Sequence, residues 1–166
     1  MVFTVSREQT QYRPGHYRHP GEATHNAHEM YRKIHNRAWL HRAWSMLTGN
    51  PEGLLDLSVV NEIYVSHSAH DAGTQTVLVE QIRGSEGRCE DFDAKFRPLR
   101  KHSEERWRKI AVAHQMEKLL PPVELIQVGD TYFVRDGHHR ISVARTFGQK
   151  YIEAHVTVWQ IDGAVQ

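Results

Sequence analysis

The sequence contains one cysteine, Cys89, so the chain cannot form an internal disulfide or a zinc site built from several cysteines. It lacks any run of roughly 18 apolar residues, the length that a membrane-spanning helix needs. Its first twenty residues, MVFTVSREQTQYRPGHYRHP, carry charges and prolines where a signal peptide would have its apolar stretch. From these absences we expect a cytoplasmic protein with no membrane partner.

A net charge is also nearly absent, because 21 Lys and Arg balance 20 Asp and Glu to give +1. The charges are nevertheless unevenly distributed, with a net of +4 over residues 1–50, -6 over 51–96 and +3 over 97–166. Six basic side chains in KFRPLRKHSEERWRK are candidates for nucleic-acid contacts, and DNA is the partner they indicate: Arg97, Arg100, Lys101, Arg106, Arg108 and Lys109. The alternative is a solvated helix face with local ion pairs, and the sequence leaves both open.

The 166 residues are enough to bury a core without disulfides or a structural metal. The pattern divides them into four parts. Residues 1–21 read as a flexible arm with prolines and glycines, and residues 22–76 as a helical extension. Residues 77–160 read as the main domain and residues 161–166 as a tail.

The extension begins with a predicted helix over about residues 22–47, in which Ala27, Tyr31, Ile34 and Ala38 repeat at helical spacing. GNPEG at 49–53 ends it. A second stripe near its end contains two tryptophans, and we expect it to pack onto the C-terminal domain or against a second copy in a homodimer: Trp39, Leu40, Ala43, Trp44 and Leu47. After it, LDLSVVNEIYV fits a short helix or a strand, and SHSAHDAGTQ predicts a loop.

The main domain alternates strands and helices, which indicates an α+β fold. We expect the following elements in order: a strand in VLVEQI, a loop in GSEGR, a helical turn in DFDAKFRPL, a helix from Ser103 to about Lys118, a hairpin of VELIQV and TYFVR around Gly129-Asp130, a helix in HHRISVARTFG closed by Gly148, and a half-buried strand in IEAHVTVW.

The segment most typical of a binding site is YFVRDGHHRISVAR, residues 132–145, where a strand turns directly into a helix. A helix N-terminus has unpaired N–H groups and the positive end of the helix dipole, so it can hold an anion. Gly137 would let a ligand approach the backbone, and Arg140 would add a bidentate contact to phosphate oxygens. Spacing alone favours the ordinary alternative, in which Asp136 is a helix cap and Arg140 a surface residue.

Residues 77–159 resemble the fold shared by ParB N-terminal domains and sulfiredoxins. The resemblance lies in the order of elements and in LPPVELIQVGDTYFVRDGHHRISVARTFGQKYIEAHVTVW, with a glycine turn ending in Arg, a helix containing Ala144, then Gly148 and a closing strand. It implies a nucleotide, CTP as in ParB proteins or ATP as in sulfiredoxins, with Mg²⁺ as its companion ion. The implied phosphate-binding residues are Gly137, His138, His139 and Arg140, with Arg88 in GSEGRCEDFD as the counterpart of the ParB arginine box.

Two departures from that resemblance limit it. His138 stands where sulfiredoxins have their catalytic cysteine, so we do not expect sulfinic-acid reductase chemistry. Where ParB proteins usually have Glu-Arg-Arg after the glycine, this chain has His-His-Arg. The chain ends seven residues after Trp159, so we expect no helix-turn-helix or partition-clamp domain and compare it with stand-alone ParB-like proteins.

Three functions stay open at this point. The first is a nucleotide-binding protein, in which hydrolysis of the nucleotide is undecided. The second is a nuclease, in which His138, His139 and Asp136 activate water directly or through a metal. The third is a DNA-binding module in which residues 95–109 make the contacts.

Other polar pairs are weaker candidates. The pairs His25–His28 and His67–His70, with Asp71 nearby, have a spacing that a metal site can use, but we favour surface or packing roles. Asp91 and Asp93 form an Asp-x-Asp pair that is more often solvated than bound to Mg²⁺. The sequence contains no P-loop motif and no GxSxG motif.

Overall fold

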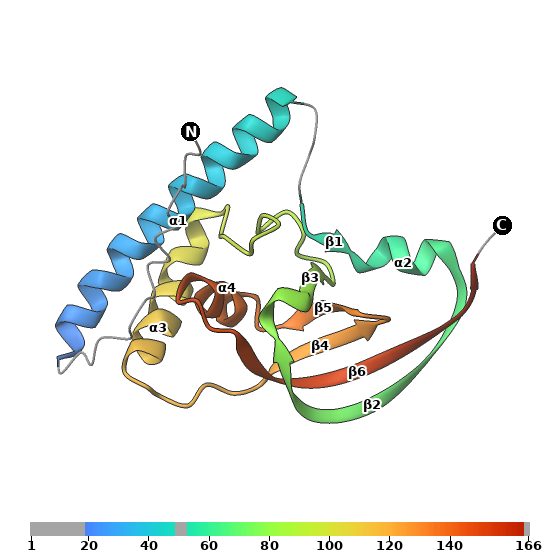
Figure 1. The fold of residues 1–166 in the computed structure, drawn as a ribbon. Helices are drawn as coiled ribbons and strands as arrows, with labels where there is room; N and C mark the ends of the chain where they lie inside the picture. Colours follow the sequence, from blue (N-terminus) through green and yellow to red (C-terminus); the bar gives the residue numbers. More distant parts are fainter. Residues whose placement is uncertain (1–18, 49–52, 165–166) are drawn as a thin grey trace, which may run out of the picture.

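The structure is a computed structural model, and it describes residues 19–48 and 53–164. The predicted α+β class is confirmed, since one mixed sheet of six strands is combined with helices (Figure 1). The elements follow in the order α1 (Pro20–Thr48), β1 (Leu55–Asp56), α2 (Leu57–Ile63), β2 (Tyr64–Leu78), the 3-10 helix η1 (Val79–Gln81), β3 (Ile82–Ser85), the 3-10 helix η2 (Lys101–Ser103), α3 (Glu104–Gln115), β4 (Val123–Val128), β5 (Thr131–Asp136), α4 (His138–Thr146) and β6 (Tyr151–Ala164).

The six strands lie in the order β1-β3-β5-β4-β6-β2. The predicted hairpin is confirmed as the antiparallel pair β4–β5, in which Val128 faces Thr131 across the turn at Gly129-Asp130. Strand β5 pairs in parallel with β3, and strand β4 in parallel with β6. Because β3 and β5 are parallel neighbours, their carboxyl ends lie at the same edge of the sheet, where α4 begins.

The two faces of the sheet bury different side chains. On β4, Leu125 packs in the larger core cluster, and the next residue, Ile126, packs on the other face with Leu57 of α2 and Phe133. This alternation is what a strand with two covered faces requires. The larger cluster also contains Ile141 of α4, so α4 covers one face of the sheet and α2 the other.

The helix α1 packs on α3 and lies away from the sheet (Figure 1). The predicted stripe of Ala27, Tyr31, Ile34 and Ala38 is buried, and its first three members join a core cluster with Trp107 of α3. The Tyr31 hydroxyl donates a hydrogen bond to the Arg100 carbonyl at 3.0 Å. Burial, with the nearby Glu104 carboxylate, raises the pKa of Tyr31 to about 12.

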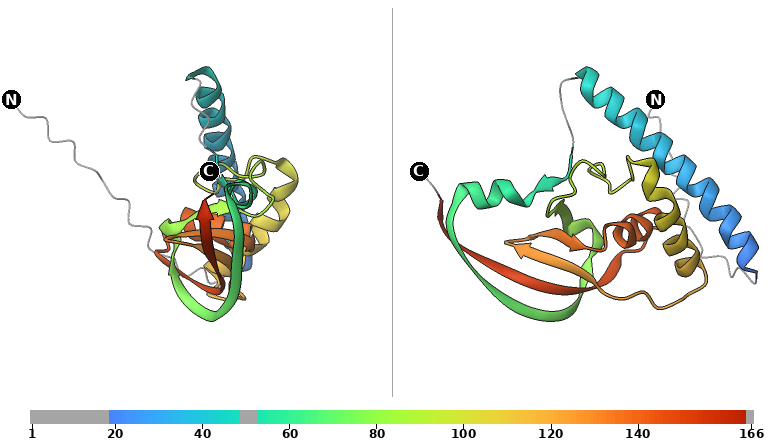
Figure 2. Two further views of the ribbon diagram at one scale, coloured as in Figure 1. Left: turned by 90° about the vertical axis from the view of Figure 1, so that its right-hand side faces the viewer. Right: turned by 180° about the vertical axis from the view of Figure 1, so that it is seen from behind.

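The second stripe of α1 is exposed. Trp39, Leu40, Trp44 and Leu47 keep between 63% and 82% of their surface, so the expectation that they pack onto the C-terminal domain is wrong. The reason is geometric, since α1 extends past the end of α3 (Figures 1 and 2), and it is Ser45, which is buried, that faces the loop after β3 there. Packing against a second copy stays a prediction.

Several predicted elements differ from the observed ones. Residues 66–75, predicted as a loop, belong to the long strand β2, which pairs antiparallel with β6 from Tyr64 to Leu78 and curves with it (Figure 2). Cross-strand pairing overrides the weak local preference of this polar stretch. The predicted strand 77–82 is divided by η1, and residues 91–99 form turns and isolated bridges in place of a helical turn.

The predicted arm at residues 1–21 and the predicted tail at residues 161–166 also differ from the structure. Pro20 and Gly21, assigned to the arm, open α1, while residues 1–18 lie outside the described residues. Residues 161–164, assigned to the tail, are the end of β6. Within residues 19–48 and 53–164, no helix is both long enough and apolar enough to cross a membrane.

Candidate functional site

The turn between β5 and α4 has a conformation that requires glycine. Gly137 has φ 102, a left-handed value that other residues rarely adopt. A Cβ atom at this position would also lie 2.5 Å from Cγ1 of Val123 on β4. Sequence reasoning took Gly137 as a residue that admits a ligand, whereas the structure accounts for it by backbone conformation and by packing against β4.

The N-terminus of α4 leaves three backbone N–H groups outside the hydrogen bonds of the helix. The first intrahelical hydrogen bond runs from the Ile141 N–H to the Gly137 carbonyl, at 3.0 Å. The N–H groups of His138, His139 and Arg140 therefore have no acceptor within the helix. They are aligned with the positive end of the dipole of a nine-residue helix, which favours an anion.

His138 is buried beneath the loop that follows β3. Only 3% of its surface is exposed, its ring stacks on Phe92 with centroids 5.6 Å apart, and its Nε2 lies 2.7 Å from the Ser85 hydroxyl oxygen. Burial is the main reason that its pKa falls to about 4, and the positive charge of Arg88 adds to the effect. His138 is therefore neutral at pH 7 and acts there through hydrogen bonding.

His139 has a similar environment. It is 5% exposed and meets Phe92 edge to face at 5.2 Å. Burial, followed by the charges of Arg88 and Arg106, lowers its pKa to about 4. Its Nδ1 is buried without a hydrogen-bond partner among the residues that the structure describes. The catalytic roles of His138, His139 and Asp136 stay predictions.

Ser85 links the two segments that sequence reasoning singled out separately. Its hydroxyl oxygen, fully buried at the end of β3, accepts a hydrogen bond from the Arg88 N–H at 3.1 Å and also bonds to His138. Sequence reasoning missed Ser85, because a serine in GSEGR has no distinguishing spacing. Only the pairing of β3 with β5 brings it to the start of α4.

Arg88 lies beside this turn. Its guanidinium binds the Asp91 carboxylate at 3.0 Å and lies over the Phe92 ring, 5.9 Å from the centroid. Its charge lowers the pKa of both histidines, which indicates that it acts on the same small region. About a third of the side chain remains exposed, so Arg88 can still contact a ligand.

Arg140 is engaged within the protein. Its guanidinium donates to the carbonyls of Pro121 and Pro122 at 2.7 and 2.8 Å, and it pairs with the Asp136 carboxylate. Its side chain is only 12% exposed. Arg140 thus fastens the segment before β4 to the turn before α4, and a direct phosphate contact would require it to exchange some of these bonds.

The basic segment predicted to contact nucleic acid is partly neutralised. Arg97 pairs with Asp93 at 2.6 Å and Lys109 with Glu105 at 2.7 Å. Arg100 lies near Glu90 and Asp91, and Arg108 near Glu104, at 3.5 to 3.9 Å. Lys101 and Arg106 are exposed and make no ion pair within the described ranges. The contact with DNA stays a prediction.

The candidate metal residues have other partners. His28 bonds to Glu104 at 3.0 Å, and His155 lies 3.1 Å from Asp71. The side chain of His67 lies outside the described residues. In the part of the chain that the structure describes, no group of three or more His, Cys, Asp or Glu is arranged to hold a metal ion.

Asp91 and Asp93 do not fit a magnesium site. Arg88 and Arg100 flank Asp91. Asp93 is 4% exposed, and its two oxygens accept hydrogen bonds from the Lys95 and Arg97 N–H groups and from the Arg97 guanidinium. Both carboxylates are thus compensated by arginine, so we derive no step through a protein-bound magnesium ion.

Cys89, the only thiol, lies in the loop after β3. Its sulfur is 3.6 Å from the Leu55 carbonyl and 3.7 Å from the Ser85 carbonyl. Burial, with the nearby Asp56 carboxylate, raises the pKa of this thiol. It is therefore protonated at neutral pH, the form in which cysteine is a poor nucleophile.

Comparison with solved structures gives weak similarity only. The structure is similar to sulfiredoxin from Arabidopsis thaliana over 50% of this chain and 82% of that chain, with a TM-score of 0.38 and 19% sequence identity. No protein-family model matches the sequence. No curated protein matches it either. The resemblance to ParB domains and sulfiredoxins therefore stays a prediction from the sequence.

Proposed function

We propose that the chain binds the phosphates of a nucleoside triphosphate, CTP or ATP, at the start of α4. The observation that carries the proposal is the position of Arg88, which two hydrogen bonds through Ser85 and His138 connect to the free N-terminus of the helix. An arginine beside N–H groups that lack a helical acceptor is what a phosphate group requires, and Arg88 would exchange its bond to Asp91 for the phosphate.

The residues of the turn have distinct roles in this proposal. The N–H groups of residues 138–140 contact phosphate oxygens, and the Arg88 guanidinium neutralises their charge. The exposed Arg106 adds a positive field at His139. His138 and His139, being neutral at pH 7, orient the turn through packing against Phe92 and the bond to Ser85. Arg140 acts as a positioning residue that holds the turn in place.

Magnesium enters the proposal only as a companion of the nucleotide. It would neutralise charge on the phosphates when it is bound there. Because arginine holds Asp91 and Asp93, the chain's own contribution is the Arg88 side chain and the helix N–H groups. Binding is therefore expected to depend on magnesium less than on Arg88.

The test is calorimetric titration of CTP, ATP and GTP, with and without Mg²⁺, into the wild type, Arg88→Gln and Arg83→Gln. Arg83 is an exposed arginine on β3. Arg83→Gln is the control, because it removes the same charge at a position away from the turn. We expect Arg88→Gln to weaken binding about tenfold or more, which corresponds to about 1.4 kcal/mol, and Arg83→Gln to change it little.

Two results would contradict the proposal. One is the absence of binding for all three nucleotides, and the other is equal binding by the wild type, Arg88→Gln and Arg140→Ala. Metal-dependent cleavage of DNA or RNA that disappears in His138→Ala and His139→Ala would support the nuclease hypothesis instead.

A further inference from the structure

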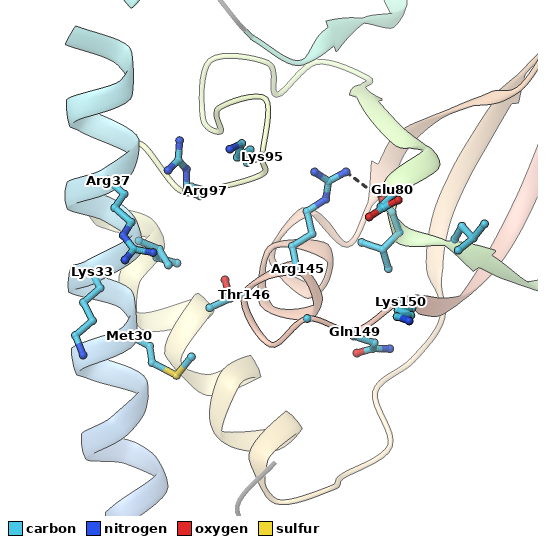
Figure 3. A pocket seen from close by; sticks show the side chains of 14 residues that line it. Met30, Lys33, Arg37, Glu80, Lys95, Arg97, Arg145, Thr146, Gln149 and Lys150 are labelled. Carbon is cyan, nitrogen blue, oxygen red and sulfur yellow. Dashed lines mark hydrogen bonds between the residues drawn. The ribbon is translucent and has the colours of Figure 1, made fainter. Parts of the chain in front are cut away.

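A hollow lies between α4 and α1, at the end of α4 opposite to the turn at Gly137. Its volume is about 980 Å³, and Figure 3 shows it bordered by α1 on one side and by α4 and η1 on the other. Met30 and Ile34 of α1 and Val79 of η1 supply part of an apolar lining. We call this hollow the α1–α4 cleft.

The charged residues of the α1–α4 cleft are almost all basic. Six cations line it against one carboxylate, that of Glu80. They come from α1, from the loop before η2, from α4 and from the turn before β6: Lys33, Arg37, Lys95, Arg97, Arg145 and Lys150. This composition is unexpected for a chain with a net charge of only +1. It is also a composition that no sequence segment displays, since the six residues are spread over more than a hundred positions.

Two of these cations are fixed by the protein. Arg145 donates hydrogen bonds to the carbonyls of Val79 and Ile82 at 3.0 and 2.6 Å, and its guanidinium lies 5.0 Å from the centre of the Phe96 ring. Its Nε is buried without a hydrogen-bond partner among the described residues. Arg97 is held by Asp93. Because the Asp93 carboxylate neutralises Arg97, the fixed positive charge on the wall of the cleft is that of Arg145.

The other four cations are exposed and make no ion pair within the described ranges: Lys33, Arg37, Lys95 and Lys150. Figure 3 shows Arg37 on α1, Lys95 and Arg97 on the loop before η2, and Arg145 on α4 directed toward the segment that carries Glu80. Like charges gathered around a hollow repel one another, and a bound anion removes that repulsion. A ligand with several negative charges would therefore gain from every wall of the cleft.

We infer that the α1–α4 cleft binds a small ligand that carries several phosphate groups. The size of the hollow is within the range typical of small-molecule sites, about 300–1,000 Å³, and its apolar lining suits the non-phosphate part of such a ligand. The site is separate from the start of α4, because nine helical residues at 1.5 Å each place the two ends about 13 Å apart.

The experiment uses inorganic tripolyphosphate as the probe, titrated calorimetrically into the whole chain. The test variant is Lys33→Gln/Arg37→Gln, which removes two charges from the α1 wall. The matched control is Arg32→Gln/Arg42→Gln, which removes two exposed charges from the same helix outside the cleft. Arg88→Gln, at the start of α4, is the second control.

We expect tripolyphosphate to bind the wild type, and the test variant to lose about tenfold or more in affinity, equivalent to 1.4 kcal/mol. The matched control and Arg88→Gln should stay within about twofold of the wild type. A Lys95→Gln/Lys150→Gln variant, which changes the opposite wall, should reproduce the loss.

Several outcomes would overturn the inference. They are no binding of tripolyphosphate, equal losses in the test variant and the matched control, and a loss in Arg88→Gln alone, which would assign the anion to the start of α4. Binding of single-stranded oligonucleotides that strengthens with their length and exceeds that of tripolyphosphate would identify a nucleic-acid surface instead of a small-ligand site.

Discussion

The Ser85 hydroxyl oxygen and the Nε2 atom of His138 lie 2.7 Å apart, in a fully buried hydrogen bond between the end of β3 and the first residue of α4. The same hydroxyl accepts the Arg88 N–H. This one group therefore holds together a strand end, a helix start and the loop that carries the candidate phosphate-binding arginine.

Ser85→Ala should destabilise the fold, because it leaves the buried His138 Nε2 and the partly buried Arg88 N–H without their partner. The expected loss is about 1–3 kcal/mol in the free energy of unfolding, measured by urea denaturation. Ser68→Ala, which removes an exposed hydroxyl bonded to Gln160 on β6, is the control and should change stability by less than about 0.5 kcal/mol. Equal effects of the two changes would contradict the importance of the Ser85 bond.

Stability should fall as the pH is lowered from about 6.5 to 4. In the folded protein the pKa of His138 and of His139 is about 4, and in the unfolded chain it returns to about 6.5, so the unfolded state binds more protons in this window. The stabilisation is complete above pH 6.5 and is lost as the pH falls toward 4, by an amount on the order of a few kcal/mol.

The measurement for that prediction is urea denaturation at a series of pH values. His139→Gln should flatten the part of the dependence between pH 4 and 6.5, because it removes one of the histidines whose pKa burial lowers. His25→Gln changes an exposed histidine on α1 and should leave the dependence unaltered. A wild type with constant stability over this window would show that the two histidines are not buried in their neutral form.

Gly137→Ala should destabilise the chain more than Gly129→Ala. Both glycines have a positive φ, 102 and 58, so both substitutions incur backbone strain of about 1–2 kcal/mol. Only at position 137 would the new Cβ also collide with Val123, since the space beside Gly129 is open. Thermal unfolding of both variants compares the two. Combining Gly137→Ala with Val123→Ala should not be additive, because the second change removes Cγ1, the closer of the two Val123 atoms in the collision, and leaves Cβ at 2.8 Å.

The exposed stripe at the end of α1 should support self-association. Large apolar side chains that remain exposed together commonly mark an interface between proteins. Sedimentation of the wild type is expected to reveal a dimer, and Leu40→Glu/Trp44→Glu should give a monomer with an unchanged circular dichroism spectrum. Arg32→Glu, earlier on the same helix, is the control. A monomeric wild type at high protein concentration would refute the prediction.

The local sequence pattern was sufficient to predict the elements in which hydrophobic periodicity and turn residues indicate the same structure. The helix over α1, the β4–β5 hairpin around Gly129-Asp130, the helix α4 and the alternating strand β6 were all predictable. Strand β2 was not, because SHSAHDAGTQ is polar and has no alternation, and it becomes a strand only through pairing with β6. The predicted helical turn at residues 91–99 failed because Asp93 there organises turns through its side-chain bonds to backbone N–H groups.

Part of the candidate site could likewise be predicted from the sequence and part could not. A strand that turns through Gly137 into a helix marks the site in the sequence, since this pattern is local. The hydrogen bonds that join Ser85, Arg88 and His138 form only because β3 lies beside β5. The local sequence of neither segment predicts that pairing.

The scarcity of cysteine, of long apolar runs and of net charge limited the classes to which this chain can belong, and its periodicity determined most helices and strands. The tertiary structure alone decided that His138 and His139 are buried and neutral, because burial depends on Phe92 folding over them from a distant loop. It alone gathered six cations around one hollow while the chain as a whole remained nearly uncharged. Local pattern follows from short-range sterics and hydrophobic spacing, whereas burial and charge clustering arise only when separate segments meet.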